Sequence, residues 1–225
     1  MATMPEQQVQ TSSGDARNLG GAEGPWPCTR DGLSLTGNWV YVGKAASFWY
    51  LSGFNFPSCP IPQGATISSA TLTINASHDE TVSVNWTIAA MAADDAATWS
   101  SDLQPYDAYE SKTTASVDWT PDNWTAANWY QSPDISSIIQ EIVNREGWVS
   151  ENGISFIFYA KNSDETLNRR IRSYDGDNEK GAKLNVEYIS GAVTSQKTIG
   201  SLPIADVATV SGLAKANVKD INGLS

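Results

Sequence analysis

Apolar and polar residues alternate along several short segments between residues 33 and 190. The alternation is clearest in TVSVNWTIA and ATLTINAS, while GISFIFYA and KLNVEYI are rich in β-branched and aromatic residues. A period of two puts alternate side chains on one face, so each segment is predicted to be a strand. The residues predicted to face the core are Val82, Val84, Trp86, Ile88, Leu72 and Ile74.

Turn residues separate these segments. Gly, Pro, Asn and Asp recur between short apolar runs from about Leu33 onward, where LSLTGNWVYVG and SFWYLSGFNF begin the series. Many short strands with such turns are typical of all-β proteins. The predicted fold is an antiparallel jelly-roll β-sandwich.

One segment, SPDISSIIQEIVNREGW, has a helical period instead. Ser132 is predicted to cap the helix, with Pro133 in its first turn and Gly147 at its end. Five apolar residues fall on one stripe, so the helix is expected to plug an edge or end of the sandwich. The stripe consists of Ile135, Ile138, Ile139, Ile142 and Val143.

Three regions follow from this pattern: an N-terminal arm over 1–32, the sandwich over 33–190, and a linker with a C-terminal repeat over 191–225. The arm is polar, with few apolar anchors, and such a stretch cannot repay the entropy lost on ordering by itself. If the arm is ordered, we therefore expect a neighbouring subunit to hold it.

The C-terminal region contains two related phrases, ADVATVSGL and ANVKDINGL. Glycines interrupt any helix or strand, so each unit is predicted to be a compact turn, with Ser211-Gly212 and Asn222-Gly223 at the bends. Two repeats are too few to bury a continuous core. We expect the tail to drive oligomerisation or docking, with packing on its own sandwich and mobility as alternatives. The assembly residues are Val207, Val210, Leu213, Val218, Ile221 and Leu224.

The net charge is −11 and no basic stripe is present. Nucleic acid and anionic membranes are therefore not expected as partners. No apolar run has the length of a membrane-spanning helix. The N-terminal sequence lacks the basic and apolar regions of a secretory signal, so we expect either a non-secreted protein or a chain whose signal has been removed.

The candidates for catalysis are few. His78 is the only histidine, and it is expected in a solvent-exposed loop. Two acidic pairs, Asp94 with Asp95 and Asp175 with Asp177, are the candidates for glycoside hydrolysis, which needs two carboxylates. Acidic turns are common in a chain of this charge, so neither pair is expected to be catalytic. The protein is not expected to be an enzyme, and no cofactor is required.

Two loops could bind ligands. The DGDNE loop offers hard oxygens from Asp175, Asp177, Asn178 and Glu179, so the alternatives are a structural calcium ion and a solvated turn. Trp86 and Trp148 are expected in the core. The turn-rich stretch near residue 120 contains aromatic residues that could stack on sugar rings or pack the loop onto the sandwich. Those residues are Trp119, Trp124, Trp129 and Tyr130.

The two cysteines, Cys28 and Cys59, each lie beside prolines in PWPC and PSCP. They could form one disulfide between the arm and the sandwich, or remain two partly buried thiols. Spacing does not decide between these alternatives.

Four motifs in this order resemble DNRLRE-type domains: FNFPSCPIPQGATISSATLTI, VDWTPDNWTAANW, SPDISSIIQEIVNREGW and RRIRSYDGDNEKGAKLNVEY. The resemblance covers roughly residues 35–189, although the hexapeptide that names the family is absent. These domains are related to non-catalytic carbohydrate-binding modules of bacterial surface and secreted proteins. The resemblance implies a jelly roll without an active site. The tail is similar to terminal segments of bacteriophage virion proteins.

Together these features predict a non-enzymatic structural protein of a bacteriophage virion, such as a decoration, fibre or tail-associated subunit. Its expected partners are other virion proteins, further copies of itself and a cell-surface glycan, and its expected location is the particle. The alternative is a glycan-binding module of a bacterial secreted or surface protein.

Overall fold

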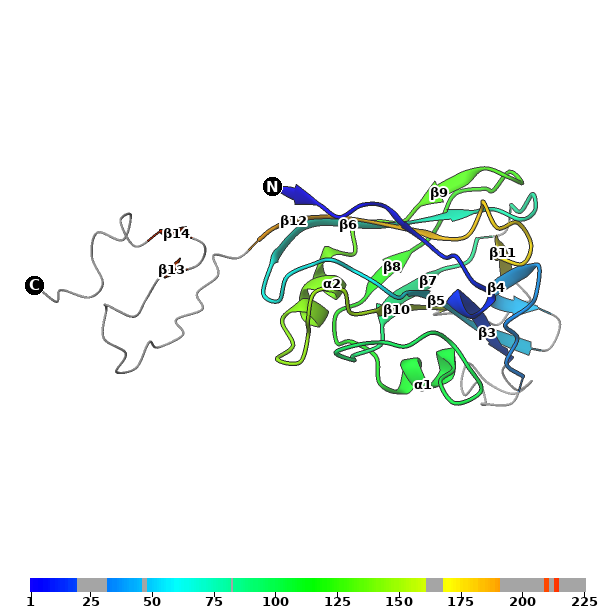
Figure 1. The fold of residues 1–225 in the computed structure, drawn as a ribbon. Coiled ribbons are helices and arrows are strands. Elements are labelled where there is room, and N and C mark those ends of the chain that lie inside the picture. Colours follow the sequence, from blue (N-terminus) through cyan, green and yellow to red (C-terminus); the bar gives the residue numbers. More distant parts are fainter. Residues whose placement is uncertain are drawn as a thin grey trace, which may run out of the picture. The chain divides into compact units, whose positions relative to one another are not determined.

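The computed structural model describes residues 1–19, 32–45, 48–81, 83–160 and 168–190, and the backbone of 209–210 and 213–214. Two compact units divide the chain, Met1–Gly191 and Ala192–Ser225. The first unit is an all-β sandwich of two antiparallel sheets, which confirms the predicted fold class (Figure 1). None of the helices in these described ranges has the length and apolar character needed to cross a membrane.

The first sheet has the order β1, β12, β6, β9, and β2 also pairs with β12. Its strands are β1 (Ala2–Thr3), β2 (Gln7–Gln8), β6 (Thr66–Asn75), β9 (Trp129–Gln131) and β12 (Lys183–Ile189). Along β12 the buried Leu184 and Val186 alternate with the partly exposed Lys183 and Asn185. One face of this sheet therefore packs in the core and the other meets solvent.

The second sheet has the order β11, β4, β5, β10, β7, β8, and β3 also pairs with β5. Its strands are β3 (Asp15–Leu19), β4 (Trp39–Ala45), β5 (Phe48–Phe56), β7 (Trp86–Ala90), β8 (Val117–Trp119), β10 (Ile154–Ala160) and β11 (Asn168–Arg172). β10 is central and buried on both faces. This burial explains why GISFIFYA is almost continuously apolar rather than alternating.

The predicted strand TVSVNWTIA is shorter in the structure. β7 begins at Trp86, whereas Val84 is buried ahead of it and Val82 lies outside the described residues. Before β7, Glu80 and Trp124 exchange backbone hydrogen bonds of 3.0 and 2.7 Å, in an isolated bridge outside the named strands. The chain reaches β7 from this bridge, so only the second half of the predicted segment TVSVNWTIA joins the sheet.

The helix α2 (Ser136–Val143) packs against β6, and its five predicted stripe residues are all buried. Its predicted start at Ser132 is wrong. Ser132 Oγ accepts a hydrogen bond from the Leu72 amide at 3.0 Å, and Asp134 Oδ1 accepts one from the Ala70 amide at 2.9 Å. These side chains anchor the chain to β6, and the helix begins only after that anchor. A second helix, α1 (Pro105–Glu110), was not predicted.

Residues 1–19, which belong to the segment predicted to be an arm, are part of the sandwich. β1 and β2 pair with β12, and β3 pairs with β5. Between them lies the short 3-10 helix η1 (Ser12–Gly14). Met4 and Val9 are each 1% exposed. These few apolar anchors suffice because backbone hydrogen bonds with the same chain also stabilise the segment.

Asn18 fixes the end of this N-terminal segment. Its side-chain Nδ2 donates to Gln104 Oε1 at 2.7 Å, and its Oδ1 accepts from the Tyr106 amide at 3.0 Å. Gln104 is the N-cap of α1 and Tyr106 lies in its first turn. These hydrogen bonds therefore connect the first strands to the helix α1.

The second unit contains a short hairpin. β13 (Thr209–Val210) pairs antiparallel with β14 (Leu213–Ala214), whereas the residues of both predicted bends, 211–212 and 222–223, lie outside the described residues. Of the six predicted assembly residues, Val210 and Leu213 lie opposite each other in this pairing. Val207, Val218, Ile221 and Leu224 lie outside the described residues.

Candidate functional site

The aromatic residues predicted as a glycan platform divide between core and surface. Trp119 is 7% exposed and Trp124 is 2% exposed. Both rings meet Trp86 edge-on, with centroid distances of 5.2 and 5.4 Å. Sugar stacking needs an accessible ring face, so for Trp119 and Trp124 the burial favours the other predicted alternative, in which they pack the loop onto the sandwich. Trp86 and Trp148 are buried as predicted.

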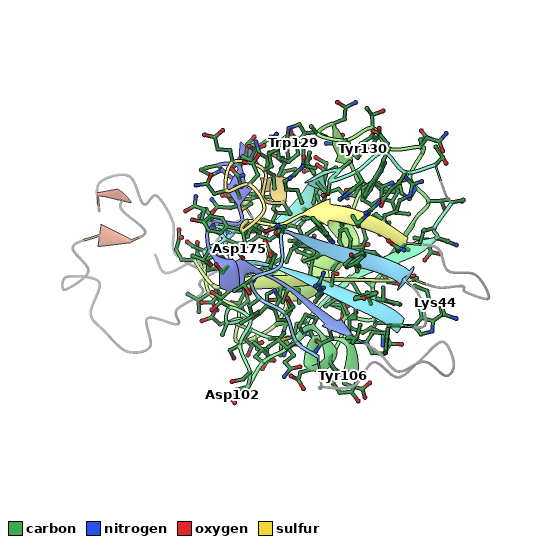
Figure 2. The ribbon with its side chains drawn as sticks, turned by 90° about the vertical axis from the view of Figure 1, so that its right-hand side faces the viewer. Lys44, Asp102, Tyr106, Trp129, Tyr130 and Asp175 are labelled. Atoms are coloured by element: carbon green, nitrogen blue, oxygen red, sulfur yellow. The ribbon has the colours of Figure 1, made fainter. Side chains whose placement is uncertain are left out.

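Trp129 is the member of this group whose side chain is clearly accessible, with 40% of it exposed. The next residue, Tyr130, points to the opposite side of β9 and stacks on Trp124 at 5.4 Å. The Tyr130 hydroxyl accepts a hydrogen bond from the Thr125 amide at 2.7 Å. Tyr130 therefore supports the loop before β9, whereas Trp129 faces solvent; Figure 2 labels both residues.

Polar side chains surround Trp129 on the outer side of the first sheet. Gln131 pairs with Thr73, and Thr73 pairs with Lys183, which makes a row across β9, β6 and β12. We call this surface the Trp129 face. It consists of Trp129, Gln131, Thr71, Thr73, Lys183 and Asn185.

Several contacts hold the Trp129 face in place. Lys183 Nζ lies 5.0 Å from the centre of the Trp129 ring, a cation–π distance. Gln131 Nε2 donates to Thr71 Oγ1 at 2.9 Å. The Glu6 carboxylate accepts from Lys183 at 2.9 Å and from Asn185 at 3.2 Å, and these bonds hold the pKa of Glu6 below its ordinary value. The ammonium, amide and hydroxyl groups are thus oriented beside one exposed indole.

This combination suits a ligand with both apolar and hydroxyl faces. An indole offers a flat apolar surface, and amides, hydroxyls and an ammonium can exchange hydrogen bonds with ligand hydroxyls. Strands hold these groups more rigidly than a loop would. The Trp129 face can therefore bind a polar ring-shaped molecule without any chemical step.

The acidic pair Asp94 and Asp95 has structural partners. Asp94 Oδ1 accepts from Arg145 Nε at 2.6 Å, just beyond α2. Asp95 Oδ1 accepts from the Gly153 amide at 2.8 Å, at the start of β10. A Cβ atom on Gly147 would clash with the Asp94 carboxylate, so the glycine predicted to end the helix instead makes room for this contact.

The DGDNE loop directs its acids to different partners. Asp175 Oδ1 accepts from Ser12 Oγ at 2.8 Å, and Asp177 Oδ2 lies 3.3 Å from Lys180 Nζ. Asp177 Oδ1 also accepts from the Glu179 amide at 3.2 Å. In the described part of the chain, no three His, Cys, Asp or Glu side chains are grouped as metal ligands. The calcium site at Asp175, Asp177, Asn178 and Glu179 stays a prediction.

Cys59 is a free thiol without solvent exposure, and burial raises its pKa to about 12. Cys28, its predicted alternative partner, lies outside the described residues. His78 is half-buried rather than solvent-exposed as predicted, with its ring 5.1 Å from that of Trp39 in an edge-on contact. Burial and the neighbouring Arg170 lower the pKa of His78.

Sequence reasoning missed Lys183, Thr73 and Gln131. Alternation along KLNVEYI could have placed Lys183 on a solvent-facing side, but not beside Trp129. That neighbourhood comes from the pairing of β6 with both β9 and β12, between segments far apart in the sequence.

Comparison with known protein families found no family model that matches this chain, and no curated protein matches it either. The family assignment suggested by the four sequence motifs therefore stays a prediction.

Proposed function

We propose that the sandwich is a non-catalytic module that binds glycan on the Trp129 face. The observation that carries this proposal is the exposed indole of Trp129, flanked on a rigid sheet by Lys183 and Gln131. Its groups are suited to holding a saccharide ring by stacking and hydrogen bonds. Asp94 and Asp95 accept hydrogen bonds from Arg145 and from the Gly153 amide, and this structural role supports binding rather than hydrolysis.

A glycan array tests this proposal, followed by titration of the best ligand. Trp129→Ala should weaken binding about tenfold or more, corresponding to roughly 1.4 kcal/mol, while the melting temperature changes little. Phe48→Ala is the matched control, because Phe48 is 41% exposed but lies on β5 of the other sheet. If both variants bind as the unaltered chain does, or if no glycan binds, the proposal is wrong.

A second role, attachment to a particle, is supported by the separate compact unit Ala192–Ser225 with its hairpin. We propose that this unit docks the module onto other subunits of a bacteriophage virion. Mass spectrometry of purified particles against the culture supernatant tests this role. Recovery of the protein only in the supernatant would instead favour a secreted or surface protein.

A further inference from the structure

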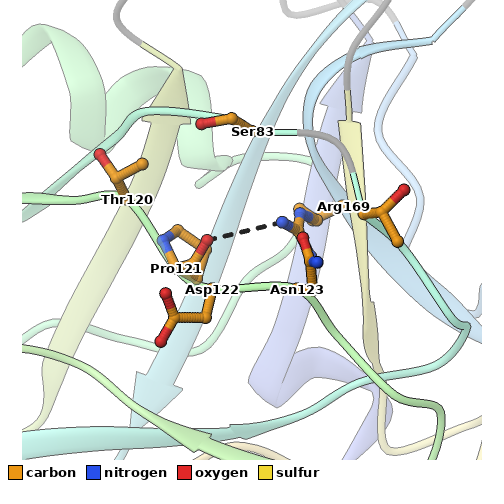
Figure 3. A pocket seen from close by; sticks show the side chains of 7 residues that line it. Ser83, Thr120, Pro121, Asp122, Asn123 and Arg169 are labelled. Carbon is orange, nitrogen blue, oxygen red and sulfur yellow. Dashed lines mark hydrogen bonds between the residues drawn. The ribbon is translucent and has the colours of Figure 1, made fainter.

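A pocket of about 430 Å³ lies away from the Trp129 face. Thr81 and Ser83 line it from the segment before β7, residues 120–123 from the segment after β8, and Arg169 from β11 (Figure 3). This volume falls in the range of small-molecule sites. The lining residues are Thr81, Ser83, Thr120, Pro121, Asp122, Asn123 and Arg169.

Arg169 is 1% exposed and belongs to the lining of this pocket. Its guanidinium donates to the Glu80 carbonyl at 2.7 Å. It also donates, at the long distance of 3.5 Å, to the Pro121 carbonyl, as the dashed line in Figure 3 marks. Its buried Nε has no hydrogen-bond partner. Arg169 is therefore a buried cation whose donors are only partly used.

The Glu80 carboxylate acts on Arg169 electrostatically but is hydrogen-bonded to another residue. The Glu80 carboxylate accepts from Arg170, through the backbone amide at 2.9 Å and through Nε at 2.6 Å. Among the residues that the structure describes, no carboxylate forms an ion pair with Arg169. The Trp124 ring, 5.0 Å away, is the guanidinium's aromatic neighbour.

A buried cation is costly unless opposite charge and hydrogen bonds compensate it. Burial lowers the pKa of Arg169 and the charge of Glu80 opposes this shift, but the Glu80 carboxylate accepts its hydrogen bonds from Arg170. A negative ligand group in the pocket would be attracted to the Arg169 guanidinium, whose Nε has no hydrogen-bond partner. The hydroxyls of Thr81, Ser83 and Thr120 and the amide of Asn123 are hydrogen-bonding groups for such a ligand.

We propose that this pocket is a second binding site, which takes the anionic group of a hydroxylated ligand, namely the carboxylate of an acidic saccharide. The site shares no residue with the Trp129 face, so the two proposals can fail independently. Arg169 supplies charge from the pocket lining, and the exposed loop groups supply hydrogen bonds. Asp122, exposed at the pocket, opposes the bound anion and weakens the site.

Titration of the full chain with glucuronate, inorganic sulfate and glucose, followed by amide NMR shifts, tests this site. Glucuronate should shift the amides of residues 81, 83 and 120–123, and its affinity should fall with added salt. Glucose should bind at least tenfold more weakly. Equal binding of glucose and glucuronate, or no shift with either anion, would overturn the proposal. Binding of sulfate but not glucuronate would overturn the assignment of the ligand as an acidic saccharide.

Two exposed loop variants keep the test independent of folding. Asp122→Asn should tighten glucuronate roughly threefold or more, because a like charge is removed. Asn123→Ala should weaken it by a similar factor. Asp122→Asn should leave glucose binding unchanged, and both variants should leave the melting temperature unchanged. Glucuronate affinity unaltered in Asp122→Asn would contradict an anion site, and Arg169→Met, if it folds, should abolish the preference for anions.

Discussion

The guanidinium carbon of Arg169 lies 5.0 Å from the centre of the Trp124 ring. Trp124 therefore packs between this cation and the Trp86 ring, and it is a core residue. Trp124→Ala is predicted to lower the free energy of unfolding by about 3–5 kcal/mol, as for other buried aromatic truncations. Urea denaturation measures this loss. Trp129→Ala, on the exposed side, is the comparison, and an equal loss in the two variants would contradict the assignment.

Asp15 should make stability depend on pH. It is 2% exposed, and burial raises its pKa to about 7 from an ordinary value of 3.8, although its Oδ2 accepts from the Tyr174 amide at 2.7 Å. Between about pH 4 and pH 7 the folded protein holds a proton that the unfolded chain releases. The free energy of unfolding should therefore fall as pH rises through this window, by up to about 1.4 kcal/mol per pH unit.

The variant Asp15→Asn isolates this effect, because the amide oxygen can still accept from Tyr174. Its stability should lack the decline between pH 4 and pH 7, and above pH 7 it should exceed that of the unaltered chain. Urea denaturation at pH 5 and pH 8 measures both values. Asp122→Asn, at an exposed site, serves as the control. The same decline in Asp15→Asn and the unaltered chain would rule Asp15 out as its source.

The N-terminal strands should stabilise the sandwich from within one chain. Met4 is 1% exposed, and its amide donates to the Val186 carbonyl at 2.9 Å. Met4→Ala should cost about 2–5 kcal/mol, whereas the exposed Gln10→Ala should cost little. The melting temperature should not depend on protein concentration. A clear increase with concentration would indicate that a second chain holds the N-terminal segment.

A chain ending at Gly191 should keep the melting temperature of the full chain, because all contacts within the unit Met1–Gly191 remain. It should lose any self-association that the C-terminal repeat provides. Light scattering of both chains measures this difference. Equal oligomeric states, together with equal incorporation into particles, would remove the attachment role from the repeat.

Local periodicity was enough to predict the strands β6 and β12 and the apolar stripe of α2, whose side chains alternate with the period of the element itself, so that burying one face selects that element. The core positions of Leu72, Ile74 and Trp86 follow from the same signal. The strand β10 was predicted from its β-branched and aromatic composition instead. The amino-acid sequence alone therefore determined the fold class and much of the core.

Only the tertiary structure decided which residues became neighbours. β1 and β2 contain no periodic apolar signal. Their place in the sheet depends on backbone hydrogen bonds with β12, so no local pattern could predict it. Trp124 and Trp129 look alike in the sequence, but the bridge to Glu80 buries one and the outward face of β9 exposes the other. Lys183 beside Trp129, and Arg169 without a carboxylate partner among the described residues, likewise result from pairing between distant segments, because sheet register rather than local pattern sets such contacts.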